Sequence, residues 1–157
     1  MAESAETVPG HDAKLVFRAG THWYAIAALS VHSIVEPRLP VPVPGTPRLV
    51  RGVVNLQGRI ATVMDVELLL ETEQGAGRRA PESRFLVIDV GDGTVVLPAG
   101  EIAGFVEVPP GALLPVQSEG IHAATATFTH AGHFVTVLDA GMLLLQAETL
   151  LLGSASP

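Results

Sequence analysis

The 157-residue sequence contains no cysteine, a single lysine and few charged side chains of either sign. The absence of cysteine excludes disulfides, thiolate metal sites and a cysteine nucleophile. Charged residues make up only 16% of the chain, and the formal net charge is −7. A surface that binds the phosphate backbone requires clustered positive charge, so we expect no nucleic-acid partner.

Long apolar runs are also missing, although the chain is apolar on average. Hydrophobic residues make up 48% of it and the mean hydropathy is +0.42, yet no run approaches the roughly 18 residues of a membrane helix. Residues 1–10 lack the basic start and apolar segment of a signal peptide. We expect a cytoplasmic protein without direct membrane insertion, whose apolar surplus is buried internally or against partners.

The strongest positive signal is an internal repeat. Residues 58–70 read GRIATVMDVELLL, and residues 132–144 read GHFVTVLDAGMLL. The Gly, Thr, Val and Asp and a Leu-Leu pair share positions at an offset of 74 residues (132 − 58). Residues 16–20 and 31–36 match residues 87–91 and 102–107 more weakly, at an offset of 71 (87 − 16). The repeat predicts two structurally similar halves.

Short apolar segments separated by turn residues predict a mainly β protein of barrel or sandwich type. The predicted strands are residues 15–17, 23–26, 49–56, 59–64, 85–90, 94–98, 122–129 and 134–138. Short helices are predicted over 66–71 and from 140 to about 152, whereas 27–35 fits either a strand or a helical turn. We expect a disordered tail over 1–12, a linker over about 72–83, and the end of the last helix and a tail over 148–157.

The segment from Pro37 to Pro47 contains five prolines in eleven residues. Proline lacks a backbone donor and holds the chain extended, so this segment is neither a helix nor a central strand. We interpret it as a rigid connection that packs on its own barrel. The alternative is a proline-rich ligand for another domain.

Two aspartates are the candidates for chemistry. Asp65 and Asp139 occupy the same place in the repeat, immediately before a predicted helix. An aspartate there caps the helix by accepting its unpaired amides, which explains both copies without a substrate. The alternative is a hydrolase or metal-dependent enzyme that uses the two carboxylates and nearby histidines such as His130 and His133. We favour helix caps and expect no catalytic residue, metal or cofactor.

The segment from Gly52 through Asn55-Leu56-Gln57-Gly58 to Asp65 resembles the signature of the CheW-like domain family. Upstream, Tyr24-Ala25-Ile26 followed by Val31 and Ile34 also matches the family pattern. The similarity extends over about residues 14–146, and we assign residues 13–147 to a CheW-like domain.

This resemblance implies two intertwined SH3-like five-stranded β-barrels with short helices and a C-terminal helix. It also implies a non-enzymatic adaptor that joins the cytoplasmic tip of a chemoreceptor to the regulatory domain of a CheA-type histidine kinase. Receptors of the family bind in a groove between the barrels. The residues that fall where the motif lines or supports this groove are Val31, Ile34, Val54, Asn55, Gln57 and Gly58.

The sequence departs from the family pattern at several functional positions. Gln57 replaces the signature arginine, Ser33 and Ala27 replace acidic residues, and Thr62 replaces a proline. Glutamine cannot make the charge-assisted bidentate contact of an arginine. The alternative is therefore a divergent accessory member, such as those of frizzy-type motility pathways, that binds receptor but not kinase. We expect Val31→Glu or Val54→Glu to weaken receptor binding and leave the fold intact.

Overall fold

The structure is a computed structural model, and it describes residues 13–69, 82–90, 93–116 and 123–146. The predicted tails over 1–12 and 148–157, and nearly all of the predicted linker, lie outside the described residues.

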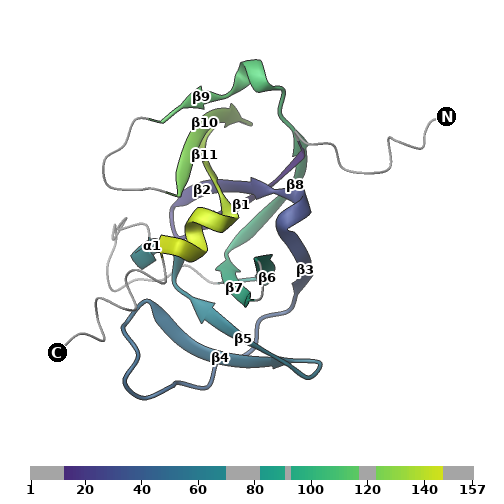
Figure 1. The fold of residues 1–157 in the computed structure, drawn as a ribbon. Helices are drawn as coiled ribbons and strands as arrows, with labels where there is room; N and C mark the ends of the chain where they lie inside the picture. The colour runs from purple at the N-terminus through teal and green to yellow at the C-terminus, as the bar shows by residue number, and fades with distance from the viewer. Residues whose placement is uncertain (1–12, 70–81, 91–92, 117–122, 147–157) are drawn as a thin grey trace.

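The described chain is mainly β, with short helices (Figure 1). The first half contains β1 (Ala13–Ala19), β2 (His22–Ala27), η2 (Ala28–Ser30), β3 (Val31–Val35), β4 (Val50–Leu56), β5 (Arg59–Met64) and α1 (Val66–Leu69). The second half contains β6 (Arg84–Val90), β7 (Gly93–Ala99), β8 (Glu101–Glu107), η3 (Pro110–Ala112), β9 (Leu114–Pro115), β10 (Ala124–His130) and β11 (His133–Leu138). Residues 140–146 are helical. The mainly β prediction is confirmed, and the ambiguous segment 27–35 forms both a 3-10 turn and a strand.

The strands form two sheets that each draw on both halves of the chain. The six-stranded sheet has the order β8-β1-β2-β11-β10-β9, and the five-stranded sheet has the order β3-β6-β7-β5-β4. Each sheet therefore combines the first hairpin of one half with the last hairpin of the other. The parallel pairs β2–β11 and β5–β7 join these contributions. The two halves interlock because neither sheet can form without the other half.

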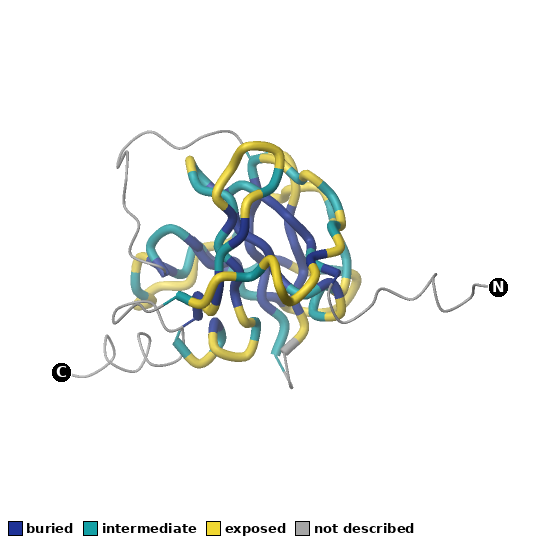
Figure 2. The backbone as a smooth tube through the Cα atoms, turned by 90° about the horizontal axis from the view of Figure 1, so that it is seen from above, coloured by how far each residue is buried: buried dark blue, intermediate teal, exposed yellow. Residues whose placement is uncertain are grey.

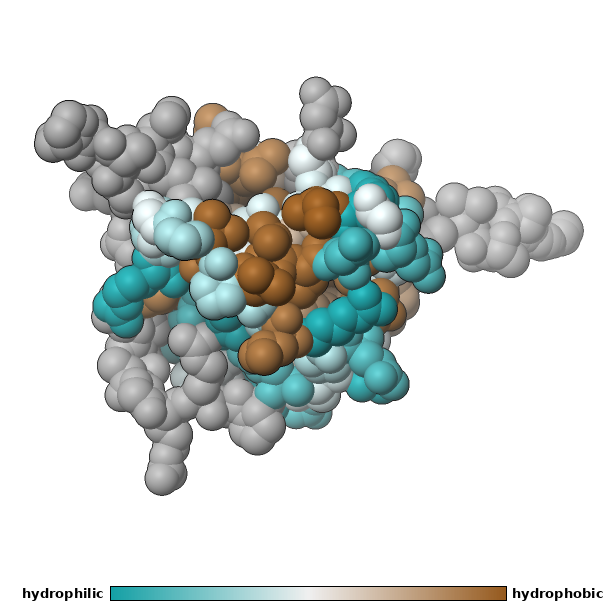
Figure 3. Space-filling model, turned by 90° about the horizontal axis from the view of Figure 1, so that it is seen from below, coloured by the Kyte–Doolittle hydropathy of each residue, from teal (hydrophilic) through white to brown (hydrophobic). Residues whose placement is uncertain are grey.

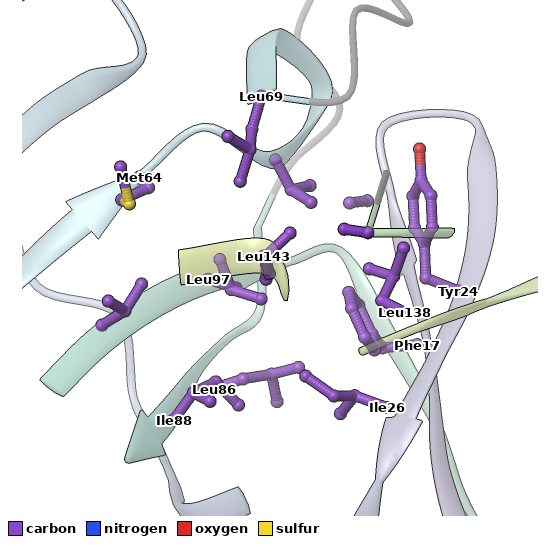
Figure 4. Packing of buried hydrophobic residues seen from close by; sticks show 14 of the residues in the cluster. Phe17, Tyr24, Ile26, Met64, Leu69, Leu86, Ile88, Leu97, Leu138 and Leu143 are labelled. Atoms are coloured by element: carbon purple, nitrogen blue, oxygen red, sulfur yellow. The ribbon is translucent and has the colours of Figure 1, made fainter. Parts of the chain in front are cut away.

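Three apolar clusters contain most of the buried residues coloured dark blue in Figure 2. The largest lies between the two sheets and includes Phe17, Ile26, Leu86 and Leu97 (Figure 4). A second cluster, around Phe128 and other residues of the six-stranded sheet, fills the opposite face of that sheet. A third cluster does the same for the five-stranded sheet and contains Val54, Ala61, Val63, Phe85, Val87 and Val96. Side chains alternate between the faces of a strand, so one sheet can contribute to its own cluster and to the shared one.

The repeat is visible in the hairpin turns. Gln57 and Gly58 have φ angles of 55° and 90°, and Ala131 and Gly132 have 50° and 82°. Both turns are two-residue loops between paired strands. Positive φ at both loop positions is the geometry that suits the right-handed twist of a β-hairpin. The turn predicted at Gln57-Gly58 is present.

The proline-rich segment packs along the edge of its own sheet. Val41 and Val53 exchange backbone hydrogen bonds of 2.9 and 3.0 Å. In the second half, Pro115 and Leu114 of β9 pair with β10 in the corresponding place. The bridge at Val41 is therefore the counterpart of β9 in the first half. The sequence did not predict the β9 strand. This packing fits the interpretation as a rigid connection.

The five-stranded sheet is curled, and β3 and β4 are its two edge strands. Val35 of β3 packs against the cluster that contains Val54 of β4, although these strands are opposite edges of the sheet. The pairings described therefore leave both sheets open and do not close either of them into a complete barrel. Pro98 in β7 lies beyond the two residue pairs that join β7 to β5, so its missing donor costs no bond there.

Candidate functional site

The six residues predicted to line or support the groove lie on two edge strands of the five-stranded sheet. Val31 and Ile34 are in β3, whereas the other four are in β4 and in the turn that follows it. The structure thus divides them into a β3 group and a hairpin group.

In the β3 group, the two side chains have different exposures. Val31 is half-buried and packs against the cluster between the sheets. Ile34 is 37% exposed and lies opposite Leu86 of β6. In the second half, Phe105 of β8 lies opposite Leu15 of β1 and is 59% exposed. Ile34 and Phe105 occupy matching positions of the repeat, so both halves expose a large apolar side chain at this place on an edge strand.

Val54 is a core residue. It is only 5% exposed and belongs to the cluster of the five-stranded sheet. A glutamate there would bury a charge without a partner, which costs several kcal/mol. The expectation that Val54→Glu leaves the fold intact is therefore wrong, and Val54 can only support a binding surface from beneath.

The hairpin group forms an exposed, well-defined turn. The Asn55 Oδ1 atom accepts the backbone N–H of Gly58 at 2.7 Å. The Gln57 side chain is exposed at the loop, where its backbone has positive φ. Asn55 and Gly58 thus hold the backbone in the shape that projects Gln57 outward.

Gln57 is one of the residues that line a pocket with a volume of about 250 Å³. Val35, Leu56 and Val87 supply its apolar surface. The polar lining consists of His32, Ser33, Arg38, Gln57, Arg59 and Thr94. Since β3, β4 and β5 all contribute, the curl of the sheet is what creates the pocket.

A network of charges lies beside this pocket and is centred on Asp89. Arg59 Nη2 is 2.9 Å from Asp89 Oδ1, and His32 Nδ1 is 3.3 Å from Asp89 Oδ2. The Thr94 hydroxyl donates to Asp89 Oδ1 at 3.1 Å and also contacts Arg59. Burial raises the pKa of Asp89, but the hydrogen bonds from Thr94 and Arg59 and the charges of Arg59 and His32 outweigh it. The pKa of Asp89 is lowered as a result.

The sequence did not single out His32, Arg38, Arg59, Asp89 or Thr94 as a group. They come from separate segments, and only the curl of the sheet and the β6–β7 pairing bring them together. The sequence held one weak indication of such a group. Charged residues are scarce in this chain, so each of them is a candidate for a functional role.

Asp65 and Asp139 have the geometry of helix caps. Asp65 Oδ1 accepts the backbone N–H groups of Glu67 and Leu68 at 3.0 and 3.2 Å. Asp139 Oδ1 accepts the N–H of Met142 at 2.8 Å. The other carboxylate oxygen of Asp65 lies 3.5 Å from Arg51. Within the described ranges, no group of three His, Cys, Asp or Glu residues is placed to hold a metal ion.

An apolar surface also lies over the β4–β5 end of the molecule. Figure 3 shows hydrophobic atoms gathered there, with hydrophilic atoms around them. The large exposed apolar side chains of the proline-rich segment and the start of β5 are Leu39, Val41, Val43 and Ile60. Contiguous apolar surface of this kind marks an interaction site more often than a chance exposure.

Among the described residues, no helix is long and apolar enough to cross a membrane.

Comparison with known proteins identifies the fold and the family. The model of the CheW-like domain matches residues 14–148. The crystal structure of the scaffolding protein TtCheW from Thermoanaerobacter tengcongensis is similar, with a TM-score of 0.74 and 17% sequence identity. The match covers 90% of this chain and 92% of that one. A search of curated proteins finds no match. The chain belongs to the CheW-like domain family, a family of chemotaxis scaffold and adaptor proteins that are not enzymes.

Proposed function

We propose that this protein is a cytoplasmic coupling protein that links the cytoplasmic tip of a chemoreceptor to the regulatory domain of a CheA-type kinase. It works by binding alone. The observation that carries the proposal is the CheW-like domain over residues 14–148, which covers nearly the whole chain.

The architecture supports a geometric role. The cluster between the sheets ties them together through large buried side chains such as Phe17 and Leu86, so surfaces on the two sheets keep a fixed relative orientation. The exposed side chain of Ile34 and the apolar surface beside β4 offer contacts on the five-stranded sheet, and Phe105 offers one on the other. A receptor helical hairpin would dock through such apolar contacts. On this proposal, the two SH3-like units are the two curled sheets, each completed into a barrel by its connecting segment.

The second candidate is an accessory member of the frizzy type that binds receptor and not kinase. The specific observation that favours it is Gln57, which is exposed at the turn where the family has an arginine. An amide lacks the charge and the paired donors of a guanidinium. This version keeps the receptor contact and loses the kinase contact.

A paired binding assay separates the two candidates. We would measure the affinity of the full chain for a receptor cytoplasmic tip and for a CheA regulatory domain by calorimetry. Binding to both indicates a full coupler, and binding to receptor alone indicates the accessory protein. Binding to neither would refute the proposal.

Two variants connect this assay to the surface. Ile34→Glu places a charge on an exposed apolar position and should weaken receptor binding at least about tenfold, because a charged side chain must then be desolvated. Leu114→Glu, at an exposed position of β9 on the other sheet, is the control for a nonspecific effect and should bind receptor normally. In the accessory case, Gln57→Arg should raise affinity for the kinase domain.

A further inference from the structure

The pocket beside Gln57 has the size of a site for one side chain. Its volume of about 250 Å³ is below the roughly 300–1,000 Å³ of pockets that enclose drug-sized ligands. It is nevertheless large enough for a short aliphatic chain with a polar head. Its occupant is therefore a single protruding group.

The chemistry of the lining specifies that group. Val35, Leu56 and Val87 form the apolar surface, and Val87 is only 2% exposed. Arg38 and Arg59 supply the formal positive charges of the lining, which contains no acidic side chain. A lining that combines apolar side chains with two guanidinium groups fits an aliphatic stem that ends in an anion.

Both arginines keep donors for a ligand. Arg38 uses Nη1 to reach the carbonyl oxygen of Asn55 at 2.7 Å. Arg59 reaches Asp89 and Thr94 through Nη2 alone. A guanidinium carries five N–H donors in a rigid, planar arrangement. These contacts among the described residues therefore leave N–H donors of both arginines for a ligand. Asp89 already neutralises part of the charge of Arg59, so a ligand anion would rely on the charge of Arg38 and on the remaining donors of Arg59.

We propose that this pocket binds the carboxylate of a glutamate side chain presented by a partner protein that docks at the β4–β5 hairpin. Arg38 and Arg59 bind the carboxylate, and Val35, Leu56 and Val87 contact its methylene groups. The two arginines thereby supply, from positions other than that of the signature arginine, the positive charge that is missing at Gln57. The inference rests on the proposed function only in taking a docked protein as the source of the glutamate.

The pocket chemistry can be tested without any partner. Pentanoate serves as a probe for the glutamate side chain, and 1-pentanol and pentylamine serve as matched neutral and cationic controls. Methyl NMR spectra of the full chain at pH 7 would follow Val35, Leu56 and Val87. We expect saturable shifts with pentanoate at a dissociation constant on the order of 10 mM, as for other fragments of this size. The alcohol should bind at least about fivefold more weakly, because a neutral group gains less from the arginines.

Two arginine variants test whether pentanoate binding depends on Arg38. Arg38→Gln should weaken pentanoate binding about fivefold or more, because it removes a charged partner. Arg48→Gln is the matched control, since Arg48 is exposed in the same segment but does not line the pocket; it should bind as the parent chain does. Absence of saturable shifts in the folded protein, or equal binding of pentylamine, would overturn the proposal.

The source of the carboxylate is tested with the receptor tip and the kinase regulatory domain. Arg38→Glu should weaken binding of at least one of them about tenfold by placing like charges together, while Arg48→Glu should not. If the parent chain binds one or both partners and Arg38→Glu binds each of these equally well, this inference fails and the proposed function stands. If neither partner binds, the proposed function fails, and the pentanoate titration still decides the pocket chemistry. Micromolar binding of pentanoate alone would instead make this a small-molecule site and overturn the partner assignment.

Discussion

At Gly52, a missing side chain allows two segments to touch. Its φ angle is +143°, and a Cβ atom there would lie 2.4 Å from the carbonyl oxygen of Val41. Val41 is the residue that pairs with Val53 and fixes the proline-rich segment to β4. A family signature glycine therefore has a physical reason in this chain, namely the close approach of backbone to backbone.

We predict that Gly52→Ala destabilises the protein by about 2 kcal/mol more than Gly45→Ala. Both positions have positive φ, so both variants incur the cost of a strained backbone, but a Cβ at Gly45 would meet nothing within 4 Å. Urea denaturation of the two variants measures the difference. Equal midpoints would show that the segment moves away from β4 without cost.

Asp89 is a second residue whose surroundings change a measurable property, namely the dependence of stability on pH. Hydrogen bonds and positive charges lower its pKa below the ordinary value of 3.8, against the opposing effect of burial. A group with a lowered folded-state pKa stabilises the fold above its unfolded pKa. That stabilisation is lost as the pH falls through the folded value.

We therefore predict that Asp89→Asn is less stable than the parent chain at pH 7 and that the difference shrinks below about pH 4. The side chain is 39% exposed, so solvent screening should keep the effect below about 1 kcal/mol. Denaturation at several pH values measures this. A difference that grows as the pH falls would contradict the assigned direction.

At the scale of elements, the two strand-to-helix junctions share one design. Asp65 and Asp139 each follow a strand, donate their own N–H to a preceding carbonyl and accept amides of the next helix. The carboxylates are therefore engaged in stabilising helix ends. Because the family is not enzymatic, the hypothesis of a hydrolase built on these two residues is wrong.

We predict that Asp139→Ala costs about 1 kcal/mol, the usual value of a lost N-cap. Asp65→Ala should cost about 1 kcal/mol more, because Asp65 is 5% exposed and also faces Arg51. Thermal or urea unfolding of both variants measures which of them loses more stability. Asn at either position retains an acceptor for the amides, so Asp139→Asn should lose less stability than Asp139→Ala, and the reverse order would count against the cap.

At the scale of the whole molecule, the exchange of hairpins controls folding. The β1–β2 hairpin lies beside β11 from the other half, and the β6–β7 hairpin lies beside β5. The cluster between the sheets also takes residues from both halves. Neither half alone has a complete sheet or a complete core.

We predict that residues 1–76 and 77–157, expressed separately, do not fold, and that mixing them restores the spectrum of the intact chain. Each half would expose unpaired strand edges and the apolar face that its partner covers. Circular dichroism and NMR of the fragments and of their mixture test this. A cooperative unfolding transition in either isolated half would contradict the interlocked arrangement.

The sequence was informative where neighbouring residues decide the outcome. It predicted the β5 strand, the turn at Gln57-Gly58 and the helix that follows Asp65. It did not predict β9, which has two residues, one of them proline. It also placed Val54 among the residues that line or support the groove but did not show that Val54 is buried, because a motif gives a position along the chain and not the face on which a side chain lies.

What the sequence determined by itself was the mainly β character, the duplication and the local turns and caps. These depend on alternation of apolar residues, positive φ and side-chain acceptors, which operate over a few residues. Only the tertiary structure decided which hairpins pair across the halves and that His32, Arg38 and Arg59 share one pocket. Strand partners are chosen by the burial of both faces across the whole chain, and that choice is not encoded in any single segment.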